Sequence, residues 1–281
     1  MELAMYNGFN SELAKNGIEK TAQRARELGF SAVEHLTMFP ENEYMPSIKD
    51  ASHMRRVLDE YGLPMACYSV CIDLYSDENG VEFLKGEADR AAELGSPYFH
   101  HTLILSRHDA HNAPSYEEAI KRIFEQAVEV AEYVETLGIT SIYEDQGFYV
   151  NGVKGFGGFF NEMKKIHKNV GVCADFGNIL FADETAEDFF KAYAKDIRHV
   201  HVKDYIFKNT ELPPSNAWAR TKNNNWLRDI IIGDGIVNFE RGFEILKEAG
   251  YNGRFSIEGG YPEPYEMGVA QAFEYLSRYW N

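Results

Sequence analysis

The sequence predicts a single α/β domain of the (β/α)8 class, the TIM barrel, in which eight parallel strands alternate with helices. Three observations predict it. Short strand-like runs alternate with longer amphipathic stretches eight times along the chain, four of the predicted helices stop at a glycine, and no Pro- or Gly-rich linker divides the chain. Its 281 residues are close to the usual length of such a barrel.

The predicted strands are short, rich in β-branched or aromatic residues, and bounded by Gly, Asp or Asn. In chain order they are Leu3–Tyr6, Ala32–Leu36, Met65–Ile72, Tyr98–Leu105, Ser141–Glu144, Gly171–Asp175, His199–Val202 and Phe255–Glu258. Runs of this length and composition are typical of strands that are buried on both faces.

The stretches between these strands have helical periodicity. The clearest are Ile18–Leu28, Val81–Leu94, Tyr116–Leu137, Phe239–Ala249 and Tyr265–Tyr279. The first four are each followed by glycine, which can adopt the left-handed conformation that ends a helix. A helix that stops at glycine and is followed closely by a strand is the repeated unit of an α/β fold.

An open, doubly wound sheet is the alternative to a closed barrel. Such a sheet normally carries a Gly-rich phosphate turn after its first strand. Here the first strand leads into YNGFNSELAKNG, which contains no G-x-G-x-x-G. We therefore expect a closed barrel that occupies residues 1–281 as one domain.

Composition and charge limit which binding partners and which cellular compartment we expect for this protein. The formal net charge is -16, which repels phosphate backbones and argues against nucleic acid as a partner. The amino terminus lacks a signal-peptide pattern, and no apolar run reaches the length of a membrane span, so we expect no membrane partner. The three cysteines, Cys67, Cys71 and Cys173, lie in apolar runs and are expected to be buried thiols, which makes the cytoplasm the default location.

Polar residues end four consecutive predicted strands. Glu144 ends the strand in TSIYEDQG, Asp175 the strand in GVCADFGN, His201 lies in RHVHVKD, and Glu258 ends the strand in RFSIEGG. In a TIM barrel the carboxyl ends of the strands share one rim, where the loops that follow them converge. Three carboxylates and one imidazole are therefore expected to meet there.

Three carboxylates that converge would repel one another unless a cation neutralises them. Oxygen ligands together with one imidazole suit Mn²⁺, Mg²⁺ or Co²⁺, and Zn²⁺ or Fe²⁺ are alternatives. The residues thus predict a divalent metal site formed by Glu144, Asp175, His201 and Glu258, with Mn²⁺ as the expected ion. Four protein ligands leave room for a bidentate substrate.

Other polar positions remain open from the sequence. Alternation along a strand points one of His100 and His101 into the barrel, and likewise one of Glu34 and His35. The segment of about 30 residues from Tyr205 to Asn238 is longer than usual for a compact domain. One expectation is a lid with a stacking surface for a sugar ring and a positive patch for an anion. The other is a solvated basic loop that packs on its own tryptophans. Its basic and aromatic residues are Lys208, Trp218, Arg220, Lys222, Trp226 and Arg228.

With these residues identified, the chain resembles the sugar phosphate isomerase/epimerase superfamily, the xylose isomerase-like TIM barrels. The resemblance is carried by ELGFSAVEHL, IYEDQG, CADFGN, HVHVKD and IIGDGIVNFERGFEILKEAGYNGRFSIEGG, which are spread over the whole chain. It implies the same four metal ligands, and it implies that Glu144 and Glu258 also act as the acid/base pair. In such enzymes one glutamate removes a proton next to a carbonyl and the other returns one.

The resemblance also suggests substrate contacts. Lys203 is a candidate contact, and His199 is either a contact or a support for the metal ligands. The remaining candidates are Asn178, His101, Trp226 and Arg220.

Three positions depart from the family's ketohexose 3-epimerases. Asn178 stands where many relatives have histidine, Phe207 where those epimerases have arginine, and Val150 where they have glutamate. These departures argue against a standard epimerase of free ketohexoses. The HVHVKD strand with a long loop after it also resembles inosose dehydratases, which eliminate water next to a ketone.

The leading hypothesis is a metal-dependent isomerase or epimerase of a sugar or sugar derivative, acting through an enediolate. A lyase of the same fold, acting on an inosose, a 3-keto sugar or a 3-keto glycoside, is the alternative. Two other classes are disfavoured: an abasic-site endonuclease, which needs more His ligands and a basic face, and a catalytically silent barrel. Aromatic residues near the carboxy terminus, Tyr275, Tyr279 and Trp280, leave room for a homo-oligomer.

Overall fold

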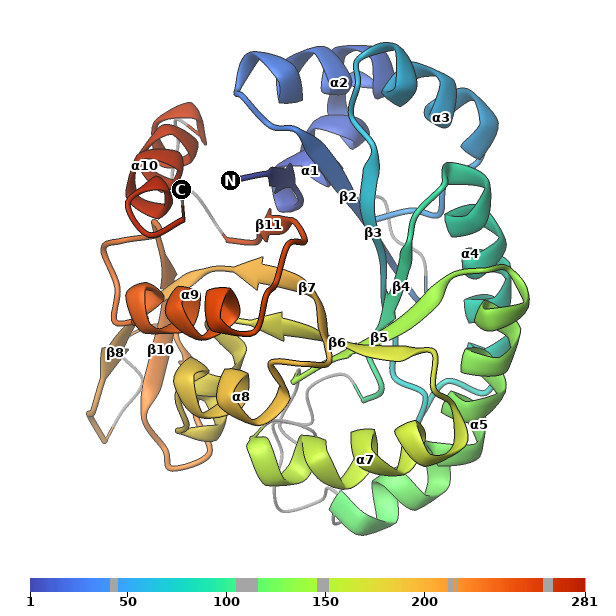
Figure 1. Ribbon diagram of the computed structural model, residues 1–281. Helices are drawn as coiled ribbons and strands as arrows, with labels where there is room; N and C mark the ends of the chain where they lie inside the picture. Colours follow the sequence, from blue (N-terminus) through green and yellow to red (C-terminus); the bar gives the residue numbers. More distant parts are fainter. Residues whose placement is uncertain are drawn as a thin grey trace.

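In the computed structural model, eight parallel strands close into a barrel, as the sequence predicts (Figure 1). The structure describes residues 1–40, 45–104, 116–145, 152–211, 215, 217–259 and 265–280. Neighbouring strands follow the order β1-β11-β7-β6-β5-β4-β3-β2 around the barrel. Strand β1 closes the barrel by pairing with β2 on one side and with β11 on the other.

The barrel strands agree with the predicted runs to within a few residues. They are β1 (Leu3–Met5), β2 (Ala32–Met38), β3 (Met65–Cys71), β4 (Tyr98–His101), β5 (Thr140–Glu144), β6 (Val170–Asp175), β7 (Ile197–Val202) and β11 (Phe255–Ile257). The last residue of the fourth predicted strand, Leu105, lies outside the described residues, as do Val150, His108 and His111. Every barrel strand is buried over most of its length, which explains why no strand shows a simple alternation of apolar and polar residues.

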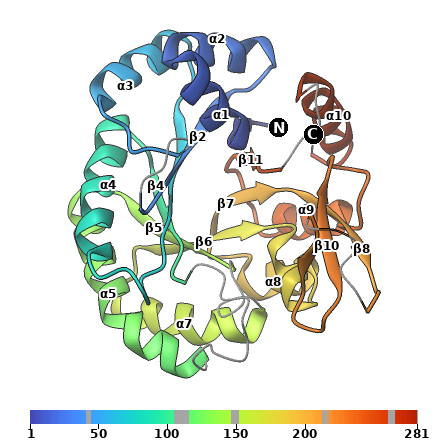
Figure 2. The same cartoon turned by 180° about the vertical axis from the view of Figure 1, so that it is seen from behind.

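Helices surround the barrel (Figures 1 and 2). They are α1 (Asn7–Asn16), α2 (Ile18–Glu27), α3 (Ala51–Glu60), α4 (Gly80–Leu94), α5 (Tyr116–Thr136), α7 (Val153–Ile166), α8 (Ala186–Tyr193), α9 (Phe239–Glu248) and α10 (Tyr265–Ser277), with a short 3-10 helix η1 (Asn178–Ala182). The glycines after α2, α4, α5 and α9 have φ angles of 90°, 73°, 74° and 76°. These positive values confirm the predicted helix stops, because glycine adopts them without strain.

Two regions of apolar packing hold the barrel together. Between strands and helices lies the main core, in which aromatic rings of α7 and α8 pack edge to face, for example Phe156 against Phe189 with ring centroids 5.1 Å apart. Inside the barrel, the small side chains of Ala4, Ala32 and Ala66 cluster near the start of the first three strands. The carboxyl ends of the strands are left for polar side chains.

The long segment after β7 folds into a sheet of its own. Strands β8 (Asp204–Lys208), β10 (Trp226–Ile230) and β9 (Ala219–Arg220) pair in antiparallel fashion and lie outside the barrel beside α8 and α9 (Figure 2). Asp183, directly after η1, holds one end of this sheet by accepting hydrogen bonds from Thr221, Asn223 and Asn225. The sequence did not predict these strands.

The carboxy-terminal aromatic rings pack on the chain's own core. The Trp280 ring lies 5.0 Å from Phe255 and 5.7 Å from Phe243, and the Tyr279 ring lies 6.3 Å from Phe243. Tyr275, Tyr279 and Trp280 remain partly exposed, and a homo-oligomer formed through them stays a prediction. Among the described residues, no helix is both long and apolar enough to cross a membrane.

Candidate metal centre

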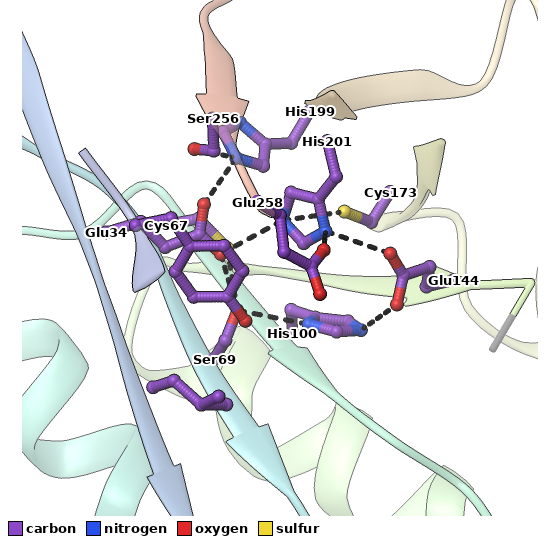
Figure 3. A network of polar contacts seen from close by, with 12 residues as sticks. Glu34, Cys67, Ser69, His100, Glu144, Cys173, His199, His201, Ser256 and Glu258 are labelled. Atoms are coloured by element: carbon purple, nitrogen blue, oxygen red, sulfur yellow. Dashed lines mark hydrogen bonds and ion pairs between the residues drawn. The ribbon is translucent and has the colours of Figure 1, made fainter. Parts of the chain in front are cut away.

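The side chains that end the fifth to eighth strands of the chain's βα series meet at one rim of the barrel. Glu144 ends β5, Asp175 ends β6, His201 lies in β7, and Glu258 follows β11 directly. One potential ligand atom from each residue lies within 4.8 Å of the others. The structure therefore brings together the four residues that the sequence expected to meet, and Figure 3 shows three of them.

The ring of His201 lies between carboxylates on both sides. Its Nδ1 atom is 2.9 Å from Glu144 Oε1 and 3.1 Å from Glu258 Oε2, while its Nε2 atom is 3.0 Å from Glu34 Oε1 (Figure 3). The side chain is 1% exposed. Its partners, rather than solvent, therefore determine its orientation and its protonation.

Asp175 uses its two oxygen atoms differently. Oδ1 accepts hydrogen bonds from the backbone N–H groups of Gly177 and Asn178, both 2.6 Å, and so fixes the turn that follows β6. Oδ2 accepts no hydrogen bond, although it is buried. Gly177 allows close packing in this turn, because a Cβ atom there would lie 2.5 Å from Cε2 of Tyr205 and 2.8 Å from Cγ of Lys203, so that these side chains would have to shift.

Lys203 places a positive charge beside the carboxylates. Its ammonium nitrogen lies 2.9 Å from Glu258 Oε1 and 3.5 Å from Asp175 Oδ2. The next residue, Asp204, accepts hydrogen bonds from the backbone of residues 233, 235 and 237, and thereby ties the loop before α9 to the end of β7. Lys203 is therefore held between the rim and a fixed loop.

Burial and the neighbouring charges act in opposite directions on the acids. Burial raises the pKa of Asp175 to about 7, against the effect of Lys203. Burial also opposes the charged form of Glu258, but Lys203 and His201 outweigh it and hold the pKa of Glu258 at about 2. Burial disfavours the charged ring of His201, but Cys173, Glu34 and Glu144 hold its pKa well above the ordinary value. The rim therefore favours positive charge at its centre.

These residues fit a divalent cation. Two buried oxygen atoms, Asp175 Oδ2 and Glu258 Oε2, accept no hydrogen bond, and His201 Nδ1 faces two carboxylates. A nitrogen lone pair next to two carboxylates is repulsive unless a proton or a cation lies between them. Carboxylate oxygen atoms and one imidazole are ligands that Mn²⁺, Mg²⁺, Co²⁺ and Zn²⁺ accept.

A layer of buried polar side chains lies beneath the rim. Glu34 of β2 accepts hydrogen bonds from Ser69 Oγ at 2.6 Å, from His199 Nε2 at 2.8 Å and from His201 Nε2 at 3.0 Å (Figure 3). His199 Nε2 is also 2.9 Å from Ser256 Oγ. Burying polar groups costs little only when they are hydrogen-bonded, and these groups satisfy one another.

The other predicted contacts are distributed unevenly. His199 points into the layer beneath the rim, and Lys203 and Asn178 lie in or beside the rim. His101 lies on the opposite face of β4 from His100, with its ring 5.4 Å from that of Tyr143. Of the two histidines it is His100 that approaches Glu144, at 3.7 Å.

Arg220 and Trp226 lie at the end of the outer sheet that is far from Asp204. Trp226 pairs with Lys208, four residues along β8 from Asp204, and the Arg220 guanidinium lies 5.9 Å from the Trp226 ring. Lys208 Nζ and Arg228 Cζ lie 4.8 and 5.2 Å from the centre of the Trp218 ring. The tryptophans thus stack on the segment's own cations, as the second interpretation of this segment expected, and substrate contact by Arg220 and Trp226 stays a prediction.

Three polar residues of the site were not assigned a role from the sequence. Glu34 was recognised only as one of a pair with His35, and His100 as one of a pair with His101. No pattern in the sequence indicated a role for Ser69. Alternation identified the pairs but could not choose the member that faces inward.

The closed barrel and the cluster at its rim define an α/β-barrel protein with a candidate site for a divalent metal. The chain belongs to the xylose isomerase-like TIM barrel family, whose sequence profile matches residues 22–279. This family includes isomerases and epimerases, and the curated relatives of this chain include lyases.

Among curated relatives, the chain is similar to inosose dehydratases. It is 29% identical over 114 residues to the inosose dehydratase of Geobacillus thermodenitrificans (strain NG80-2), which covers 38% of this chain and 35% of the relative. It is 31% identical over 112 residues to that of Bacillus cereus (strain AH820), covering 38% and 34%. The match thus spans about a third of the length of these relatives.

Solved structures share the fold at low identity. A D-psicose 3-epimerase with D-tagatose from Clostridium cellulolyticum H10 has a TM-score of 0.76 at 15% identity, covering 99% of both chains. A 3-keto-D-glucoside 4-epimerase from E. coli has a TM-score of 0.75 at 16% identity, again covering 99% of both. A xylose isomerase-like TIM barrel protein from Mycobacterium smegmatis, in complex with magnesium, has a TM-score of 0.69 at 19% identity, covering 99% of this chain and 95% of that one.

Proposed function

We propose that this protein is a metal-dependent isomerase or epimerase of a sugar or sugar derivative, which transfers a proton at a carbon next to a carbonyl group. One observation carries the proposal: Glu144 and Glu258, from opposite sides of β7, approach the same atom of His201 at 2.9 and 3.1 Å. Two carboxylates that face one point can remove a proton from a substrate and return one to it.

In this proposal Glu144, Asp175, His201 and Glu258 hold a divalent cation, with Mn²⁺ expected and Mg²⁺, Co²⁺ or Zn²⁺ as alternatives. The ion would supply positive charge beside the carbonyl oxygen, which makes the neighbouring carbon more acidic. The fit of the four ligand atoms within 4.8 Å and the buried oxygen atoms without hydrogen bonds support this assignment.

Glu258 and Lys203 are expected to have different roles in the proposed proton transfer. Glu258 is partly exposed, with 19% of its side chain accessible, whereas Glu144 is 2% exposed, so Glu258 lies nearer to an entering substrate. Lys203 holds Oε1 of Glu258 and leaves Oε2 directed toward the cluster. Lys203 is therefore a candidate both for orienting this glutamate and for contacting a substrate hydroxyl.

A lyase acting on a cyclic or 3-keto polyol is the second candidate. The similarity to inosose dehydratases supports it, and so does the shared first step, because loss of water β to a ketone begins with the same proton abstraction. The two candidates differ in the fate of the substrate. An epimerase keeps its mass, whereas a dehydratase removes one molecule of water.

The test is a mass-resolved screen in deuterated water. Protein loaded with Mn²⁺ is incubated with ketoses, sugar phosphates, an inosose and 3-keto glycosides. The proposal expects a product of the substrate's own composition carrying one deuterium at the carbon next to the carbonyl. Loss of water would instead establish the lyase. Metal-loaded protein that exchanges no deuterium with any substrate would contradict both.

Glu144→Gln and Glu258→Gln should each lower the exchange rate by at least about 100-fold, the usual contribution of a general acid or base. The matched control is Glu87→Gln, because Glu87 is also a buried carboxylate but lies in α4, bonded to Tyr68 and Ser47. Full activity in both site variants would refute the acid/base assignment.

A further inference from the structure

Glu34 is the centre of the polar layer beneath the rim. It is 0% exposed, and three donors point at its two oxygen atoms: Ser69 and His201 at Oε1, and His199 at Oε2. These contacts, at 2.6, 3.0 and 2.8 Å, are within hydrogen-bond distance, and the serine hydroxyl and both imidazoles can donate. A charged carboxylate can only accept hydrogen bonds, so each of the three partners must donate to it.

This requirement fixes the proton on His201. Because Nε2 donates to Glu34, the atom left for a cation is Nδ1, which faces Glu144 and Glu258 at 2.9 and 3.1 Å. A carboxylate that accepts the second N–H of a metal-binding imidazole commonly fixes both the tautomer and the ring orientation. Here that carboxylate comes from β2, on the other side of the barrel from β7.

The same chain of hydrogen bonds reaches His100. Ser69 gives its only proton to Glu34, so at its second contact, 3.0 Å from His100 Nδ1, it must accept. His100 therefore carries its proton on Nδ1. Its Nε2 atom is buried, makes no hydrogen bond and lies 3.7 Å from Glu144 Oε2.

We propose that Glu34 is a positioning residue that sets the tautomers of both rim histidines, presenting Nδ1 of His201 to the cation and Nε2 of His100 as an acceptor for a substrate hydroxyl group. The inference rests on the proposed metal site. It adds Glu34 as a residue that acts without touching the metal or the substrate. It also adds His100 Nε2 as the atom that accepts the hydroxyl proton of a polyol substrate.

A second metal site is the competing explanation of this layer, since Glu34, Cys67 and His199 also have ligand atoms within 4.8 Å of one another. Hydrogen bonds already join Glu34 and His199, and burial raises the pKa of the Cys67 thiol well above its ordinary value. A thiol must lose its proton to bind a metal. The hydrogen-bonded hub therefore explains the layer without an ion.

The experiment compares Zn²⁺ affinity, measured by competition with a chromogenic chelator, across four proteins. Glu34→Gln keeps the size of the side chain but offers an N–H₂ group where an acceptor is needed, and should weaken Zn²⁺ binding by about 10- to 100-fold. Glu87→Gln, an equally buried control remote from the rim, should bind as the wild type does. Cys67→Ala should also be unchanged, whereas a loss of bound Zn²⁺ in Cys67→Ala would establish the second metal site instead.

A spectroscopic measurement on the wild type tests the proposal even if Glu34→Gln does not fold. In ¹⁵N-labelled, Zn²⁺-loaded protein, two-bond ¹H–¹⁵N correlations should show His201 protonated on Nε2 and His100 protonated on Nδ1. In Ser69→Ala, His100 should lose this preference while His201 keeps its tautomer. The opposite tautomer on His201, or equal Zn²⁺ affinity in Glu34→Gln and wild type, overturns the inference. Wild-type protein that binds no metal at all would instead refute the proposed function.

Discussion

Lys203 places its positive charge beside the carboxylates of Asp175 and Glu258, which would otherwise repel each other. Its ammonium group contacts Glu258 and Asp175, and its side chain is only 7% exposed. Removing one partner of a buried ion pair leaves the other charge uncompensated, which costs more than the pair itself contributes. Lys203 therefore stabilises the metal-free rim, and in the proposed metal-bound state it would compete with the ion for the same carboxylates.

Lys203→Met should lower the free energy of unfolding of the metal-free protein by roughly 3 kcal/mol, because the buried carboxylate of Asp175 and the partly buried one of Glu258 lose a counter-charge. The same variant should gain a larger increase in Tm than the wild type when Mn²⁺ is added. Thermal unfolding with EDTA and with excess Mn²⁺ measures both effects.

Lys164→Met is the matched control, since Lys164 pairs with Asp196 at 2.7 Å but is 40% exposed. Exposed pairs contribute about 0–1 kcal/mol, so this change should have little effect with or without metal. An equal metal-induced shift in Lys203→Met and wild type would contradict the competition.

At this scale the sequence predicted the ends of strands well and the inner layer poorly. Glu144, Asp175 and Glu258 end or directly follow their strands, where the barrel fold itself dictates convergence. Glu34 lies at a register shift between β2 and β3, where a bulge can turn a side chain to the other face. Because β2 is buried on both faces at this point, hydrophobicity could not distinguish Glu34 from His35.

The outer sheet and its anchor are the clearest features at the scale of elements. Asp204, the first residue of β8, accepts four backbone hydrogen bonds, from residues 205, 233, 235 and 237. Gly235 can approach this carboxylate only because it has no side chain: a Cβ atom there would lie 2.1 Å from Asp204 Oδ1 and 2.4 Å from the carbonyl oxygen of Tyr205. At residues 233–235, which read GDG, the backbone is therefore in close contact with the backbone at Tyr205.

Gly235→Ala should destabilise the protein by about 1–3 kcal/mol, because a rigid backbone atom and a fixed carboxylate must both move. Gly86→Ala should have the opposite sign and stabilise it by about 0.5–1 kcal/mol, since Gly86 lies within α4 and its added Cβ would meet only Arg90, at 3.5 Å. Urea unfolding of the two variants side by side measures the difference. Equal effects would refute the close-contact explanation.

The outer sheet could not be predicted because two of its three strands, β9 and β10, lie in a segment without a clear strand pattern. Residues 219–230 mix Arg, Lys, Asn and Trp, and only two residues form β9. The sheet is stabilised by Asp183 and Asp204, which lie outside that segment. Contacts between residues so far apart in the chain leave no local periodicity in the sequence.

For the molecule as a whole, buried histidines outside the metal cluster make stability depend on pH. Burial lowers the pKa of His35 and of His101 to about 4. Above pH 6.5 both are neutral in the folded and unfolded chains, so stability is fully present. As the pH falls from 6.5 toward 4, the unfolded chain binds protons that the folded chain does not, and stability is lost at up to about 1.4 kcal/mol per pH unit for each group.

The contribution of these histidines is isolated by comparing the wild type with His101→Phe in urea unfolding at pH 7, 6 and 5 with EDTA present, because Asp175, whose pKa burial raises to about 7, changes stability in the opposite direction over this range. The stability of His101→Phe relative to the wild type should rise as the pH falls from 7 to 5, because phenylalanine binds no proton in the unfolded chain. Phenylalanine is the suitable replacement because an aromatic ring keeps the packing against Tyr143 and Phe99. The same pH dependence of stability in His101→Phe and in the wild type would contradict this account.

The global fold could be predicted because the same sequence pattern, a strand-like run followed by a helix, recurs along the chain. Eight strand-like runs and four glycine helix stops each give a weak signal, but together they define one architecture. Registers and bulges, by contrast, depend on pairings between strands, such as the shift between Val172 and Cys173 in β6. A single sequence contains no direct record of those pairings.

Strand β1 acquires its second neighbour only when β11 has formed, because Leu3 pairs with Phe255 and Met5 with Ile257. Glu258 follows β11 immediately, and its backbone N–H binds the carbonyl oxygen of Val202. During synthesis, the chain therefore carries Glu144, Asp175 and His201 well before the strand that both seals the barrel and delivers Glu258. Because the same strand closes the barrel and positions Glu258, a nascent chain cannot bring all four residues together before β11 has joined the barrel.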